Sequence, residues 1–282
     1  MPSILINDKD ILYLRKAILT IVPKIGLPKI INASVNNETD DLRIKFNVEK
    51  TNEADPNRST IQIYNLNEQS RALFKADKTR VVLEAGYRNT KAVIFKGDVT
   101  KSIDTYERVD IITTVELGDG DNTYRNARFD KGYPAGISTV QIVTEISEAM
   151  ELPISSVKGL PIFKYANGIT LSGVIRKQLD MLMKKDNLEW SIQDETLQIL
   201  PRDETTNDDI IKINPSSGLI GSPSATDKGV EFISLLQPRL RPGRSVFLDS
   251  KFIKGSFKLR TVTHTGDSFS GEFVSKCECT DK

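Results

Sequence analysis

The chain has 282 residues, of which 38% are hydrophobic and 27% charged, a balance typical of a soluble globular protein with two or three modest domains. Its 39 lysines and arginines match its 38 aspartates and glutamates, so net charge gives no attraction to nucleic acid or to an anionic membrane. Two cysteines and one histidine are too few for a disulfide framework or a typical zinc site.

The N-terminal region, residues 1–31, is predicted to be an arm. Pro23, Gly26 and Pro28 interrupt regular structure near its end. Residues 10–20 can form a short helix. Two interpretations stay open: a first helix that packs on its own domain, or an arm that packs on a neighbouring subunit. We expect no secretory signal and no membrane span, because no apolar run reaches about 18 residues.

Residues 32–120 are predicted to be a first β-barrel domain. Apolar and polar residues alternate over residues 42–49, as in a half-buried strand. A strand–strand–helix–strand order of this kind is typical of a small barrel with a helix at one end. The Gly-Asp-Gly-Asp of residues 118–121 is interpreted as a turn, because the other ligands of a calcium loop are missing. Strands are also predicted over residues 60–64, 80–87, 92–99 and 109–117, and a helix capped by Asn67 over residues 68–76.

Residues 121–205 have a different periodicity and are predicted to be an α/β insert domain. Ser138 and Gln141 form a capping box for a helix that ends near residue 149. A second helix is predicted over residues 172–185, where apolar residues recur at helical spacing. A hairpin follows, with strands over residues 189–192 and 196–201.

Residues 206–282 return to β structure and are predicted to be a second β-barrel domain. Strands are expected around residues 246–248, 257–261 and 269–277, separated by glycine-containing turns. Cys277 and Cys279 fall on one face of the last strand and are interpreted as small core residues. The fold class is therefore predicted to be mainly β with an α/β insert.

Residues that could carry catalysis do not form a recognisable pattern. His264 is interpreted as a histidine that stabilises a turn, because no nucleophile motif accompanies it. Glycoside hydrolysis would need two facing carboxylates. Glu145 and Glu148 are instead interpreted as part of a solvated helix face. Phosphate-binding loops are absent from the sequence. We therefore predict that the protein is not an enzyme and has no catalytic, cofactor-binding or metal site, and no cofactor.

One region has a local charge bias. Between residues 235 and 260, seven basic residues accompany a single acidic residue, Asp249. A solvated hairpin face is one interpretation, and contact with neighbouring subunits or with DNA passing through a ring is the other. The candidate subunit or lumen contacts are Arg239, Arg241, Arg244, Lys251, Lys254 and Lys258.

Several segments together resemble phage baseplate hub proteins, a family related to the hubs of contractile injection systems. Ser-Thr-Ile-Gln-Ile-Tyr-Asn-Leu-Asn at residues 59–67 and Val-Ile-Phe-Lys-Gly-Asp-Val at residues 93–99 resemble the first barrel of that family. Residues 174–201 resemble its insert. The most specific likeness is C-terminal, where four segments follow in the order of the family: residues 217–223, 235–243, 254–259 and 262–267.

The resemblance covers roughly residues 32–280 and implies two tube-type β-barrel domains flanking an α+β domain. It implies a homotrimer that forms a pseudo-six-fold ring, links the tail tube protein to the spike protein and contacts other baseplate proteins. DNA would pass through the ring without sequence specificity. The expected location is the virion tail baseplate, after assembly in the host cytoplasm.

Three alternative functions stay open. The chain could be the hub of a phage-derived injection particle without a genome, such as a tailocin. It could also be a tail-tip enzyme that degrades peptidoglycan, or a cell-wall-binding module. An aromatic content of 7% counts against the last of these, because carbohydrate-binding modules display exposed aromatic side chains.

Overall fold

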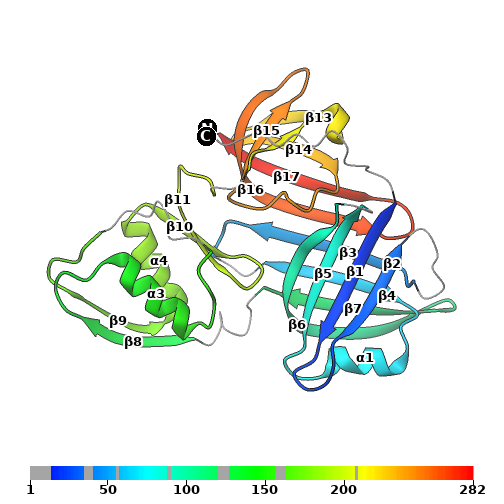
Figure 1. The fold of residues 1–282 in the computed structure, drawn as a ribbon, viewed down its shortest axis with the longest axis horizontal. Helices are drawn as coiled ribbons and strands as arrows, with labels where there is room; N and C mark the ends of the chain where they lie inside the picture. The colour runs from blue at the N-terminus through cyan, green and yellow to red at the C-terminus, as the bar shows by residue number, and fades with distance from the viewer. Residues whose placement is uncertain are drawn as a thin grey trace.

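The computed structural model describes residues 14–34, 41–54, 57–87, 90–119, 127–155, 163–206 and 209–281. Three groups of elements follow one another along this part of the chain, and we call them the first β-module, the insert and the second β-module (Figure 1). The first β-module contains β1 (Arg15–Val22), β2 (Lys29–Ser34), β3 (Ile44–Thr51), β4 (Arg58–Tyr64), α1 (Glu68–Lys75), β5 (Arg80–Tyr87), β6 (Ala92–Glu107) and β7 (Asp110–Gly118).

The insert lies to one side of the β-modules in Figure 1 and has its own apolar core, which includes Ile146, Leu179 and Trp190. The capping box of Ser138 and Gln141 is present at the start of its first helix, as predicted. Its second helix starts three residues later than predicted, because residues up to Val174 pair as a strand. The insert contains β8 (Arg128–Tyr133), α3 (Thr139–Ala149), β9 (Ile169–Val174), α4 (Ile175–Lys185), β10 (Leu188–Ile192) and β11 (Leu197–Pro201).

The second β-module contains strands that the sequence did not predict. Its elements are β12 (Ile211–Ile213), a 3-10 turn (Pro215–Ser217), β13 (Leu219–Thr226), β14 (Gly229–Leu235), β15 (Ser245–Asp249), β16 (Lys254–Asp267) and β17 (Phe273–Asp281). Among these, β12, β13 and β14 were missed. The turn between β15 and β16 is present but contains no glycine: it is closed by a hydrogen bond from the amide of Ser250 to the carbonyl oxygen of Ile253, and β16 begins at Lys254. Phe269 precedes the last strand, whereas Cys277 and Cys279 are buried in it as predicted.

The N-terminal segment differs most from the prediction. β1 is a strand, not a helix, in the described part of residues 10–20. Ala17, Leu19 and Ile21 are buried on one face with the period of two that a strand requires. β1 pairs antiparallel with β2 and, along its whole length, with β5 of the same chain. The residues from Pro23 to Pro28 are therefore the turn of a hairpin that belongs to the sheet.

The β-strands of both modules form one sheet of 13 strands, in the order β13-β14-β17-β16-β3-β4-β7-β6-β5-β1-β2, with β15 and β12 continuing from β16. The mainly β fold is therefore confirmed. Within the described ranges no β ladder closes either module into a barrel. In the first β-module the sheet curls around a buried apolar cluster, and the amide of Leu42 donates to the carbonyl oxygen of Asn32, 3.0 Å away, across the gap between β2 and the start of β3.

The two β-modules share the same strand order. In the first it is β3-β4-β7-β6-β5 and in the second β13-β14-β17-β16-β15, so the first, second, fifth, fourth and third strands are neighbours in each. All these neighbours are antiparallel. A β-bulge follows Val99 in β6 and Leu259 in β16, each one residue beyond the last position paired with the third strand. The chain therefore contains the same five-strand core twice, to which β1, β2 and α1 are added in the first β-module and β12 in the second.

The two modules are joined edge to edge. Residues 45–51 of β3, the first strand of the five-strand core in the first β-module, pair with residues 261–267 of β16, the fourth strand of the core in the second. Phe273 from β17 completes this joint, because its buried ring lies edge-on to the rings of Phe46 and Tyr87 in the first β-module. We call this contact the β3–β16 joint.

Candidate functional site

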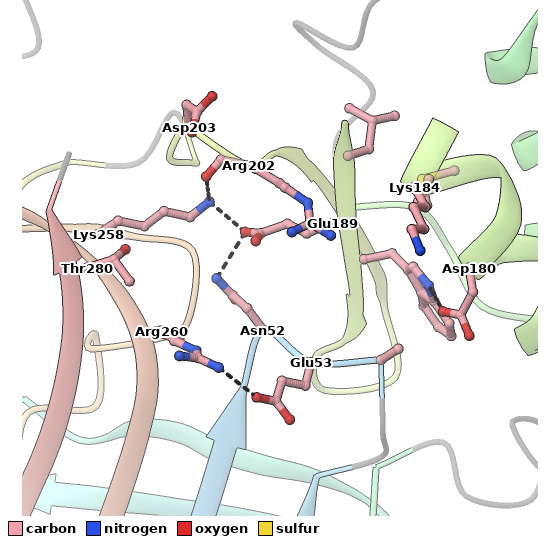
Figure 2. A pocket seen from close by; sticks show the side chains of 14 residues that line it. Asn52, Glu53, Asp180, Lys184, Glu189, Arg202, Asp203, Lys258, Arg260 and Thr280 are labelled. Carbon is pink, nitrogen blue, oxygen red and sulfur yellow. Dashed lines mark hydrogen bonds and ion pairs between the residues drawn. The ribbon is translucent and has the colours of Figure 1, made fainter. Parts of the chain in front are cut away.

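A cleft with a volume of about 770 Å³ lies where the insert meets the second β-module and the end of β3 (Figure 2). Its walls carry several charged side chains, which would be a first place to look for catalysis. Figure 2 shows Lys258 and Asn52 pointing toward Glu189, and Arg260 pointing toward Glu53. The lining residues labelled there are Asn52, Glu53, Asp180, Lys184, Glu189, Arg202, Asp203, Lys258, Arg260 and Thr280.

Ion pairs in the cleft connect different parts of the chain. Lys258 from β16 lies 2.5 Å from Glu189 of β10, and its amine also donates to the carbonyl oxygen of Arg202 at 2.9 Å. Arg260 from β16 lies 3.0 Å from Glu53, just after β3. Each carboxylate is thus neutralised by a cation from the second β-module. These two ion pairs therefore connect the second β-module to the insert and to the first β-module.

A second charged contact lies at the tip of the β10–β11 hairpin. Gln193 and Thr196 close a two-residue turn through backbone hydrogen bonds of 2.9 and 3.1 Å. The turn residues Asp194 and Glu195 have φ angles of 53° and 60°, a region in which non-glycine residues are uncommon. Such a conformation persists where surrounding contacts impose it.

Asp119, directly after β7, supplies those contacts. Its carboxylate oxygens accept hydrogen bonds from the backbone amides of Asp194 at 2.6 Å and Glu195 at 2.8 Å. Cations from both β-modules hold the two turn side chains: Lys50 and Arg241 pair with Asp194, and Arg80 and Lys96 pair with Glu195. We call this set of contacts the hairpin latch. Asp119 belongs to the stretch that was interpreted as a turn, whereas Gly120 and Asp121 lie outside the described residues.

Asp119 of the hairpin latch and the nearby His264 are fully buried and have shifted pKa values. Burial raises the pKa of Asp119 from 3.8 to about 7, against the opposing effect of the Lys50 charge. Burial lowers the pKa of His264 from 6.5 to about 3, and the Lys50 charge lowers it further. His264 lies inside β16 and shares a 2.8 Å hydrogen bond with Ser275, so its predicted role at a turn was wrong. The reason is that β16 extends further than the glycine pattern indicated.

These shifts predict opposite pH dependences. Folded His264 binds fewer protons than the unfolded chain between about pH 3 and 6.5, so its contribution to stability is lost as the pH falls through that window. Folded Asp119 binds more protons than the unfolded chain between about pH 3.8 and 7, so its contribution to the stability of the fold grows as the pH falls through that window. When the pH is lowered from 7 to 5, the free energy of unfolding of His264→Gln should change by about 2 kcal/mol more favourably than that of the unchanged protein, because the variant lacks the histidine that loses stability there. That of Asp119→Asn should change by about 2 kcal/mol less favourably, because the variant lacks the carboxyl that gains stability there.

Urea unfolding of the three proteins at both pH values measures these differences. The unchanged protein is the control, because it contains both contributions. Parallel pH profiles for all three proteins would show that neither side chain titrates as described.

The six basic residues predicted as candidate subunit or lumen contacts lie in different environments. Lys258 is buried in the cleft, and Arg241 reaches Asp194 and the carbonyl oxygen of Val93. Three others lie at the surface: Arg239 lies 3.8 Å from Asp209, Lys254 lies 3.1 Å from Asp249, and Lys251 lies over the ring of Phe252. Arg244 is half-buried and donates to the carbonyl oxygen of Arg239. The structure therefore divides the six residues between internal and surface positions, and their contact with subunits or DNA stays a prediction.

Exposed apolar side chains gather at hairpin ends. Ile25 and Leu27 at the β1–β2 turn are 87% and 88% exposed, and Tyr106 and Val109 at the β6–β7 turn are 82% and 92% exposed. Apolar surface of this kind marks sites of contact with other proteins when it is grouped. Neither a metal cluster nor a membrane-spanning helix is found in the described ranges.

Comparison with known proteins assigns the family. The sequence model described as baseplate hub gp41 matches residues 29–279. The chain belongs to the baseplate hub gp41 family. This confirms the resemblance drawn from the sequence. No curated protein matches the sequence.

Solved structures share the fold of this hub-family chain at low sequence identity. The 43 kDa tail protein of prophage MuSo2 from Shewanella oneidensis has a TM-score of 0.66 at 9% identity, over 95% of this chain and 97% of that one. The E. coli c3393 protein, a component of the type VI secretion system, has a TM-score of 0.59 at 9% identity, over 88% and 76%. A tail protein from Neisseria meningitidis MC58 has a TM-score of 0.56 at 8% identity, over 94% and 97%.

Proposed function

We propose that the chain is the structural hub of a phage tail baseplate. Three copies form a pseudo-six-fold ring that links the tail tube to the central spike and leaves a channel for DNA. The two β-modules act as tube-type barrel domains, and the insert is an α+β domain between them. The ring is part of the virion after assembly in the host cytoplasm, and DNA passes through it without sequence-specific contacts.

The repeated β-module is the observation that carries this proposal. Three chains with two equivalent modules each present six similar units, which is what a joint between a six-fold tube and a three-fold spike needs. The hairpin latch and the ion pairs of the cleft fix the modules relative to one another. A rigid chain of this kind suits a part that must keep its shape under load.

A non-enzymatic role fits the charged residues. Glu53 and Glu189 are paired with cations, and Lys131 holds the pKa of the Glu145 carboxyl below its ordinary value. A general acid in glycoside hydrolysis needs a raised pKa instead. The one carboxyl with a strongly raised pKa, among those described, is Asp119, which is buried at the hairpin latch.

A hub of a genome-free injection particle is the second candidate. The fold shared with a type VI secretion component favours it, because that system is one in which a tail-like fold works outside a virion. The same ring and spike contacts would serve in both cases.

Native mass measurement tests the proposal. The purified chain alone is expected to have three times its monomer mass of 31.5 kDa, and the mixture with its spike partner is expected to contain a complex with three copies of the chain. A chain that stays monomeric under both conditions would overturn the hub assignment.

A further inference from the structure

We infer that neighbouring copies in the ring are joined by β13 of one copy and the C-terminal half of β6 of the next, in the register of the β3–β16 joint. This inference rests on the proposed ring. β13 and β3 are the first strands of the two five-strand cores, and β6 and β16 are the fourth. The joint between copies would then repeat the joint that the chain already contains.

The two strands have free edges at the required places. β13 is the end strand of the sheet, and no described strand pairs with its outer edge. β6 pairs with β5 only up to Asp98, while its pairing with β7 continues to Glu107. In β16 the corresponding half carries β3. An unpaired edge of this kind is a template for another strand.

Three side chains on these two strands are apolar and exposed. Ile103 and Tyr106 on β6 are 41% and 82% exposed, and Ile220 on β13 is 41% exposed. The end of the β6–β7 hairpin extends beyond the neighbouring strands in Figure 1, whereas β13 lies at the far side of the second β-module. The two edges therefore cannot meet within one chain but are available to different copies.

The bulges fix which residues of β6 and β16 correspond. Counting from each bulge, Asp104 occupies the position of His264, and Thr105 that of Thr265. Side-chain contacts agree with this alignment. Thr113 donates to Asp104 over 2.8 Å, just as Ser275 and His264 share a 2.8 Å hydrogen bond.

The positions in β13 follow from its pairing with β14. Ala225 is opposite Val230, and Val48 of β3 is opposite Ser59, the residue of β4 that corresponds to Val230. Ser224 therefore corresponds to Asn47. Within the chain, the hydroxyl of Thr265 donates to Asn47 over 3.0 Å.

The inference thus places Thr105 of one copy opposite Ser224 of the next. Both side chains are exposed in the single chain. Ile103 would lie opposite Thr226, and Asp104 opposite Ala225. The predicted ladder is short, because a bulge in β13 separates Ile220 from Ser224.

Cysteine cross-linking between two single variants tests this register. Thr105→Cys and Ser224→Cys chains are mixed in equal amounts and oxidised, so that only contacts between copies can form the mixed disulfide. Ala225→Cys replaces Ser224→Cys in the matched control, because its side chain points to the opposite face of the strand. Cys277 and Cys279 are buried and should not compete. We expect the mixed dimer to form at least tenfold faster with Ser224→Cys than with Ala225→Cys.

Native mass of the same samples separates two failures. A trimer that cross-links no better through Ser224→Cys than through the control overturns the register and leaves the proposed ring intact. A chain that never forms a trimer overturns both.

Discussion

Replacing Asp194 with asparagine is expected to lower the free energy of unfolding by about 3 kcal/mol, because the change leaves a buried amine without its ionised partner. The Lys50 amine lies 2.5 Å from Asp194, and only 1% of its side chain is exposed. Asparagine keeps the shape of the side chain and tolerates the φ of 53° at this position. Urea unfolding at pH 7 measures the loss.

Glu195→Gln is the matched control, since it lies in the same turn. Its cationic partners Arg80 and Lys96 are 47% and 43% exposed, so water replaces much of what the ion pairs contribute. The expected loss is below about 1 kcal/mol. Equal losses for the two variants would mean that burial of Lys50 does not set the strength of the hairpin latch.

Phe273→Ala is expected to lower the free energy of unfolding by about 4 kcal/mol, because it leaves a cavity in a well-packed core. The ring is 1% exposed and lies 5.8 Å from the Phe46 ring and 5.5 Å from the Tyr87 ring, centre to centre. Gly266 packs against the same rings, and a Cβ added there would clash with the Phe46 ring. The packing at the β3–β16 joint therefore leaves little room for collapse around the cavity.

This variant should loosen the joint before the rest of the protein. We expect amides of β3 to exchange with deuterium faster, with little change in the insert, whose core is separate. Phe269→Ala is the control, because that ring is 39% exposed and should cost less than about 1 kcal/mol. Faster exchange throughout the chain would show that Phe273 supports the whole fold rather than the joint.

Local patterns in the sequence predicted the elements that depend on neighbours in the chain. Alternation gave β3, and capping residues gave the starts of α1 and α3, where Asn67 and Ser138 accept from backbone amides as expected. These signals need only a few consecutive residues. β1 was mistaken for a helix because Arg15 and Lys16 at its start hide the alternation that follows.

Elements held by distant partners were harder to predict. β13 reads Leu-Ile-Gly-Ser-Pro-Ser-Ala-Thr, which lacks alternation because a bulge interrupts the strand. The hairpin of β10 and β11 was predicted, but its partner Asp119 lies 75 residues away from Asp194 along the chain. Lys258 was counted with surface cations, since nothing local shows that it pairs with Glu189. Each of these depends on which segments meet in space.

The β3–β16 joint also has a consequence for synthesis on the ribosome. Arg43, just before β3, pairs with Asp267 at the end of β16, which is 224 residues further along the chain. Translation proceeds at roughly 5–20 residues per second, so the edge of β3 stays unpaired for about 10 to 45 s until β16 has been synthesised. During that time a nascent chain on the same messenger carries an identical uncovered edge nearby. Slow or crowded translation should therefore favour wrongly joined chains, and a chaperone that shields β3 would raise the yield of correctly folded hubs.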